Sequence, residues 1–74
     1  MRVCDSFTYN GTVFAACAGS GISRDMKINR IRVNGTEYRV KHTEVREAFI
    51  GVLQAMFEID GSQPVPKGEV TVLA

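Results

Sequence analysis

The stretch TEVREAFIGVLQAMFEI, residues 43–59, decides which fold this chain adopts. Thr43 suits the N-cap of a helix, and Glu44 in the first turn complements the helix dipole. The apolar residues recur at the i, i+3, i+4, i+7 spacing of an amphipathic helix; they are Val45, Ala48, Phe49, Val52, Leu53, Met56 and Phe57. This spacing predicts one helix over about residues 43–59.

The same stretch also contains the pattern of a strand. Every second residue near its end is apolar, which is the period of a half-buried strand. The helix explains more residues over a longer span, so we expect the helix, and the strand stays the alternative for residues 49–59. The alternating apolar residues are Leu53, Ala55, Phe57 and Ile59.

Two Asn-Gly pairs ahead of this stretch predict β-hairpins. Asn10-Gly11 and Asn34-Gly35 each lie between β-prone runs, and both positions of such a turn need positive φ. Residues 18–23 join the hairpins, and the Pro-containing residues 60–68 form a loop before a short final strand. The expected fold is α+β: two antiparallel β-hairpins, one helix packed on their sheet and a short C-terminal strand, in a single small domain over residues 1–74.

A family resemblance predicts an alternative fold. FTYNGTVFAACAGSGI, MKI, VNGTEYRVKHTEV and PVPKGEVTVL follow one another along nearly the whole chain. This order resembles the second β-barrel of translation elongation factor Tu and its relatives. The resemblance implies a stand-alone all-β small barrel, with RNA contact as one expected role. The chain departs from the family at Asp25, where a glycine usually precedes Met26, and it lacks the nucleotide-binding motifs of a translational GTPase.

Pairing within the first hairpin brings the two cysteines together. The turn at Asn10-Gly11 sets a register that places Phe7 opposite Phe14 and Cys4 opposite Cys17. The cysteines then face each other at a site where Cα atoms lie about 4.5 Å apart, within reach of a disulfide. The alternative is two unlinked thiols packed as small apolar groups in a reducing cytosol, and we expect that state.

The second hairpin carries cations on its solvent side. Arg32 would face Glu37 in a cross-strand ion pair, and Arg30 would face Arg39, which is a like-charge contact. We expect a bulge near Asn29–Arg30 to displace the two arginines into water. The alternative is a basic strip that binds an acidic partner or phosphates, formed by Arg30, Arg32, Arg39 and Lys41.

The predicted helix also offers a face for a partner. Gly51 and Ala55 are four residues apart, so they would stack on one side of a helix and let another backbone approach closely. A chain this short buries a modest core, and a homodimer would add to the buried area. The candidate dimer face consists of Ile50, Gly51, Gln54 and Ala55.

Few residues could perform catalysis or bind a metal ion. His42 is the only histidine, and two cysteines with one histidine are too few for a zinc site of four protein ligands. No serine or cysteine has a base at a recognisable spacing. We therefore expect no enzyme activity, no metal and no cofactor.

Composition narrows the class of function. The chain is 45% hydrophobic, which is normal for a folded domain. Its formal net charge is +1, so the protein as a whole has no strong electrostatic field that attracts polyanions. Neither a spanning segment nor a secretory signal is recognisable, so we expect a cytoplasmic protein without a membrane partner. The expected function is a non-enzymatic binding module acting through protein–protein contacts, a homodimeric adaptor or inhibitor of the kind phages and mobile elements encode. The alternative is nucleic-acid or nucleotide binding through the basic hairpin face.

Overall fold

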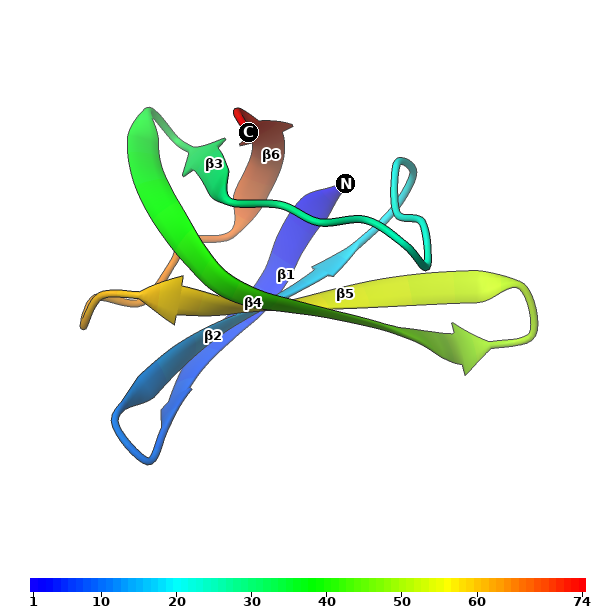
Figure 1. Cartoon of the computed structure of the whole chain (residues 1–74), viewed down its shortest axis with the longest axis horizontal. Coiled ribbons are helices and arrows are strands. Elements are labelled where there is room, and N and C mark those ends of the chain that lie inside the picture. Colours follow the sequence, from blue (N-terminus) through cyan, green and yellow to red (C-terminus); the bar gives the residue numbers. More distant parts are fainter.

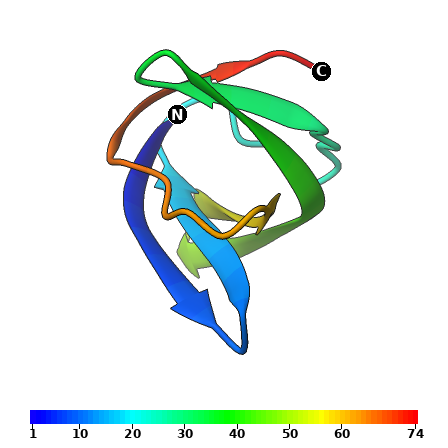
Figure 2. The ribbon, with the colours of Figure 1, turned by 90° about the vertical axis from the view of Figure 1, so that its left-hand side faces the viewer.

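The computed structural model describes residues 1–74 and contains six strands and no helix (Figure 1). The strands close into one antiparallel barrel in the order β1-β2-β5-β4-β3-β6, and Figure 2 shows them curving around a common interior. The α+β prediction is therefore wrong, and its all-β barrel alternative fits. The strands are β1 Arg2–Tyr9, β2 Thr12–Ala18, β3 Arg30–Val33, β4 Thr36–Phe49, β5 Val52–Asp60 and β6 Gly68–Val72.

Residues 43–59 form most of the β4–β5 hairpin in place of the predicted helix. The alternation near the end of the stretch decides the outcome, because Ala55, Phe57 and Ile59 all point into the barrel and are buried. The helical stripe is not buried as a unit, since Phe49 is 77% exposed. A strand paired on both sides of a closed barrel buries one face completely, and the period of two satisfies that requirement.

Gly51 is part of the turn that ends β4. Phe49 pairs with Val52, so Ile50 and Gly51 make a two-residue turn. The φ of Gly51 is +75°, a conformation that L side chains rarely adopt. The glycine that would weaken a helix is therefore the residue that lets the hairpin form.

Replacing Gly51 by alanine distinguishes the turn from the predicted helix. We expect Gly51→Ala to lower the free energy of unfolding by about 1–2 kcal/mol, because a side chain is unfavourable at this φ. A methyl group there would meet no atom within 4 Å, so the cost is conformational and not steric. In a helix the same change would raise stability. Urea denaturation measures the difference, and a stabilised variant would contradict the hairpin.

Both predicted Asn-Gly turns are confirmed. Asn10 and Asn34 each have a φ of 50°, and the following Gly11 and Gly35 have φ values of 76° and 78°. Positive φ at both central residues matches the twist of the flanking strands, which is why Asn-Gly is favoured there. The predicted facing of Phe7 and Phe14 is also confirmed, since their rings stack with centroids 5.4 Å apart.

The loop between β5 and β6 packs into the core of the barrel and is hydrogen-bonded to β1. Val65 from this loop is buried in the core, and its N–H donates a hydrogen bond of 3.0 Å to the Ser6 hydroxyl on β1. The same hydroxyl donates to the carbonyl of Phe14 at 2.9 Å. One serine thus satisfies a loop amide and a strand carbonyl inside the protein, which avoids the cost of unpaired buried groups.

The β4–β5 hairpin extends beyond the barrel as an arm (Figure 1). The last residue of β5 to pair with β2 is Ala55, which lies opposite Cys17, and the last residue of β4 to pair with β3 is Arg39. Residues 44–54 therefore have strand partners only within their own hairpin. We call residues 44–54 the arm.

Candidate functional site

The basic strip predicted from the sequence lies on the outer surface of β3 and β4. Arg30 pairs with Arg39 and Arg32 with Glu37, so the predicted register is confirmed. The expected displacement of Arg30 from Arg39 does not occur, because this register runs unbroken from the turn to Arg30. All of these charged side chains are exposed, while Ile31 between them points into the core. The N–H groups of Asn29 and Arg30 both donate to the Ala74 carbonyl, at 2.7 and 3.2 Å, and Ile28 before them is buried, as the expected bulge required.

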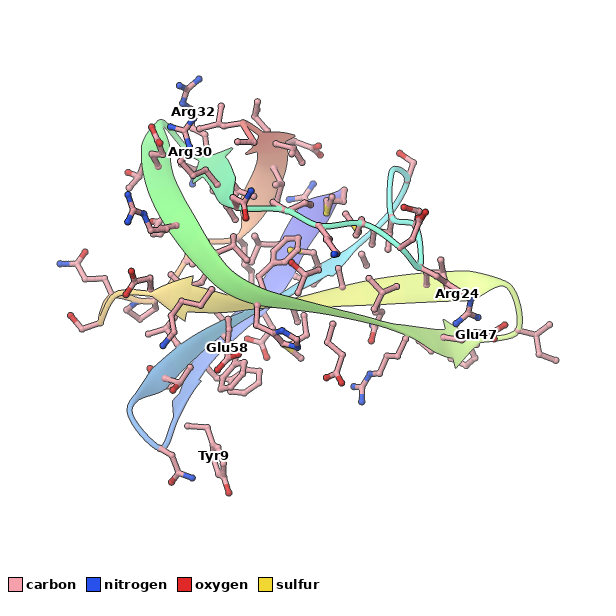
Figure 3. The ribbon with its side chains drawn as sticks, viewed as in Figure 1. Tyr9, Arg24, Arg30, Arg32, Glu47 and Glu58 are labelled. Carbon is pink, nitrogen blue, oxygen red and sulfur yellow. The ribbon has the colours of Figure 1, made fainter.

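Glu37 relieves the repulsion between the facing arginines. Its carboxylate lies 2.7 Å from the Arg30 guanidinium, diagonally across the strands, and not against Arg32 as the facing pattern predicted. Arg32 and Arg39 have no carboxylate within 4.0 Å. Figure 3 shows Arg30 and Arg32 together at the β3 end of the barrel.

Lys41 extends this set of cations at a bulge in β4. The register with β5 shifts between Val40 and His42, so Lys41 is the extra residue. The bulge falls just after β4 stops pairing with β3, where the strand continues beside β5 alone. Bulges bend a strand and re-aim its side chains, and they are frequent next to functional sites.

The end of the arm exposes apolar side chains. Phe49, Ile50 and Val52 surround the turn, and Ile50 is 99% exposed. We call Phe49, Ile50, Gly51 and Val52 the arm tip. An exposed apolar cluster at the end of a projecting hairpin is unusual for a surface that meets only water.

Glu47 fixes the geometry of the arm tip. Its Oε2 accepts a hydrogen bond of 2.6 Å from the Gly51 N–H, and its Oε1 lies 2.9 Å from the Arg24 guanidinium. Figure 3 shows Arg24 reaching from its loop to this carboxylate. The Gly51 N–H in particular, and the Arg24 charge in addition, hold the pKa of Glu47 below its usual value of 4.5.

The lowered pKa makes the arm tip sensitive to acid. A carboxyl group with a depressed pKa in the folded protein contributes stability above its ordinary value of 4.5, and loses it as the pH falls through the lowered value. We expect the amide resonance of Gly51 to titrate with the Glu47 carboxyl in NMR spectra, and to lose that titration in Glu47→Gln. A Glu47 pKa at or above the ordinary value of 4.5 would contradict the capping contact.

The candidate dimer face predicted on the helix is not formed. Ile50 and Gly51 lie in the turn, while Ala55 is buried inside the barrel. Gln54 pairs with Arg46 on the arm and is half-buried. The i, i+4 spacing stacks two side chains only in a helix, and here Gly51 belongs to the turn while Ala55 lies further along the extended strand β5.

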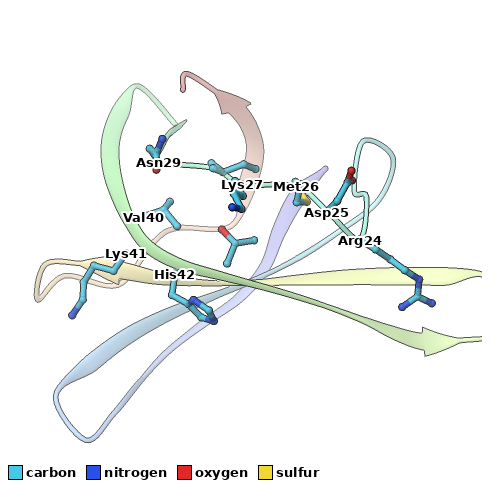
Figure 4. A pocket seen from close by; sticks show the side chains of 10 residues that line it. Arg24, Asp25, Met26, Lys27, Asn29, Val40, Lys41 and His42 are labelled. Atoms are coloured by element: carbon cyan, nitrogen blue, oxygen red, sulfur yellow. The ribbon is translucent and has the colours of Figure 1, made fainter.

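A groove separates residues 24–29 from β4 (Figure 4). It has a volume of about 410 Å³. The Val40 N–H donates to the Asn29 carbonyl at 2.8 Å on one side of this region, and the Arg24–Glu47 pair joins the same two segments on the other. The groove is lined by Arg24, Asp25, Met26, Lys27, Ile28, Asn29, Val40, Lys41, His42 and Thr43.

The two cysteines are free, and their predicted facing is wrong by one residue. Cys17 pairs with Val3, because β1 has a bulge between Val3 and Asp5 that leaves Cys4 without an opposite residue. Cys4 is exposed and Cys17 is buried. Burial, with a smaller contribution from the nearby Cys4, raises the pKa of the Cys17 thiol to about 12.

Residues with catalytic or metal-binding side chains are dispersed. No three His, Cys, Asp or Glu side chains lie close enough together to hold a metal ion. His42 is exposed and pairs with Glu58 across β4 and β5. No helix is long and apolar enough to span a bilayer.

Comparison with known proteins found no matching family model, no matching curated protein and no matching solved structure. The all-β barrel that the resemblance to the second β-barrel of elongation factor Tu implied fits the structure. The RNA contact that the same resemblance implied stays a prediction. Sequence reasoning named the residues of the basic strip and placed Ile50 and Gly51 on a candidate partner face, but it missed the turn that forms the arm tip, and it missed the groove. One sequence signal for the arm tip was available. A glycine, Gly51, follows the apolar pair Phe49-Ile50 and lies between two segments in which apolar and polar residues alternate.

Proposed function

We propose that this protein binds nucleic acid through the phosphate backbone, using the basic strip of Arg30, Arg32, Arg39 and Lys41. The supporting observation is that Arg32 and Arg39 lie on one exposed face without carboxylate partners. Guanidinium groups bind phosphate through two parallel hydrogen bonds, and such contacts are strong when no internal anion competes for them.

The aromatic residues near the strip argue for backbone contacts over base recognition. Tyr38 pairs with Ile31 on the inward side of the hairpin, so its ring is half-buried. Tyr9 is exposed, but it lies at the β1–β2 turn, away from Arg30 and Arg32 in Figure 3. Without a ring beside the arginines, bases have no stacking platform. Binding is then independent of sequence and depends on salt.

Salt dependence tests the proposed function. We expect a fluorescent oligonucleotide to bind at about 50 mM salt with an affinity that falls linearly in a plot of log affinity against log salt concentration. The double variant Arg32→Gln/Arg39→Gln should bind more weakly, with a slope reduced by about 2, because two phosphate contacts are lost.

Lys67→Gln is the matched control, because Lys67 is an exposed cation in the loop between β5 and β6. This variant should keep the affinity and slope of the unmodified protein. Equal losses in the control and in the double variant would show general attraction and would refute the strip. Absence of binding to both DNA and RNA at low salt would refute the function.

A second candidate function is protein docking through the arm tip, of which a homodimer is the simplest form. The observation that favours it is the full exposure of Ile50 on a turn that Glu47 holds in one conformation. A preorganised loop loses less conformational entropy when it binds, so a small apolar contact contributes more affinity.

Sedimentation equilibrium tests the homodimer. We expect the unmodified protein to associate as its concentration rises, and Ile50→Asp to stay monomeric because a carboxylate would be buried in the contact. Since Ile50 is exposed, the free energy of unfolding should change by less than about 0.5 kcal/mol. Glu69→Gln, which changes an exposed charge on β6, serves as the control. A monomer at every concentration would exclude self-association through the arm tip.

A further inference from the structure

Three aromatic side chains lie on the outer face of the β1–β2 hairpin. Phe7 faces Phe14, and their rings stack with centroids 5.4 Å apart at an interplanar angle of 21°. Val13 and Ala15, on either side of Phe14, are buried in the barrel, so Phe14 and Phe7 point outward. Phe7 is 42% exposed, and Tyr9, two residues further along β1, is 65% exposed. We call Phe7, Tyr9 and Phe14 the aromatic cluster.

Three carboxylates share this outer face. Glu58 on β5 lies directly opposite Phe14, which puts their Cβ atoms about 4.5–5.5 Å apart. Asp60 follows Glu58 by two residues, and Asp5 precedes Phe7 by two residues, so both point to the same face as their neighbours. The aromatic cluster therefore has carboxylates beside it on β1 and on β5.

No cation within the protein neutralises these carboxylates. None of the three has a cationic nitrogen within 4.0 Å. The next strand, β4, places Arg39 opposite Asp60 and His42 opposite Glu58, so these two side chains border the face on one side. β2 has no charged residue, and Arg2, the only cation on β1, lies at the far end of that strand in an ion pair with a carboxylate of β6.

An arginine side chain would satisfy both parts of this surface. Its planar guanidinium stacks on aromatic rings, and it pairs with a carboxylate through two parallel hydrogen bonds. A lysine ammonium group has neither the plane nor the fork of donors. Exposed rings can also stack with nucleic-acid bases, but carboxylates beside them would repel the phosphates of the same strand.

We propose that the outer face of β1, β2 and β5 binds an arginine-rich segment of a partner protein. One arginine lies over the aromatic cluster, between Asp5 and Glu58. Exposed rings alone would accept any apolar surface, whereas carboxylates without a cation select a positively charged partner. In Figure 3, Tyr9 and Glu58 lie on the side of the molecule that the β1–β2 hairpin occupies, away from the Arg32 side chain. The proposal therefore concerns a second surface and does not depend on nucleic-acid binding by the basic strip.

NMR titration with a blocked peptide of four Arg-Gly repeats tests this surface. At about 1 mM peptide, the amide resonances of Phe7, Phe14 and Glu58 should shift, while those of Gly35 and Lys67 stay in place. The matched Lys-Gly peptide should bind about fivefold more weakly, because it loses the stacked and bidentate contacts of the guanidinium.

Two variants separate the charge from the rings. Glu58→Gln should weaken binding of the Arg-Gly peptide about tenfold, because a charge-assisted pair is lost. Phe7→Leu keeps an apolar side chain and should weaken binding about threefold, because the cation–π contact is lost. The control is Asp25→Asn, since Asp25 is an exposed carboxylate without an ion pair on the loop between β2 and β3. It should bind like the unmodified protein, and the peptide-free spectrum of each variant shows whether the barrel is intact.

Arg32→Gln separates this proposal from the proposed function. It should bind the Arg-Gly peptide like the unmodified protein while it binds an oligonucleotide more weakly. Peptide binding that persists when no oligonucleotide binds would retain the aromatic face and reject the basic strip. Oligonucleotide binding without any peptide shifts would do the reverse.

Four results would overturn the arginine site. The first is the absence of shifts at about 1 mM peptide. The second is equal affinity for the Arg-Gly and Lys-Gly peptides, or an equal loss in Asp25→Asn and Glu58→Gln, since either would show general attraction between opposite charges. The third is an oligonucleotide that shifts Phe7 and Phe14 more strongly than the peptide does, which would assign the face to nucleic acid. The fourth is a shift of the same amides when the protein alone is concentrated, which would assign the face to a second copy of the chain.

Discussion

Alternating burial along β5 is the constraint on which the rest of this protein depends. Phe57 has no exposed surface, and its neighbours Ala55 and Ile59 fill the barrel beside it. Over Ala55–Ile59 the strand pairs with β2 on one side and β4 on the other, so these residues cannot shift by one position without turning the core outward. The register of β4, the direction of the arm and the position of the groove all follow from this placement.

The sequence predicted local turns well because the chemistry of each turn is contained in its own two residues. Asn10-Gly11 and Asn34-Gly35 need positive φ, and the registers of the first residues beyond each turn follow directly. The final strand was predicted for a similar reason, since prolines mark the loop before it. The second register also placed Arg30 opposite Arg39, so the candidate basic strip was available from the sequence.

The errors arose where tertiary structure selects between local patterns. Residues 43–59 satisfy both the helical and the strand periods, and the closed barrel selects the strand. The turn at Ile50-Gly51 lacks the asparagine that marked the other two hairpins, so it was not recognised. No sequence pattern indicates the bulges at Cys4 and Lys41. Each bulge shifts the strand pairing of the residues beyond it by one position. The groove brings residues 24–29 beside residues 40–43, from the far side of the β3–β4 turn, which no local pattern predicts.

The bulge in β1 has a chemical consequence for the two thiols. It leaves Cys4 exposed, while Cys17 is buried and its pKa is raised to about 12. Thiolate, and not thiol, reacts with electrophiles, so a maleimide or iodoacetamide should label Cys4 and spare Cys17 in the folded chain. The native protein thus carries a single attachment point for a fluorophore, and labelling of the second cysteine reports that the barrel has opened.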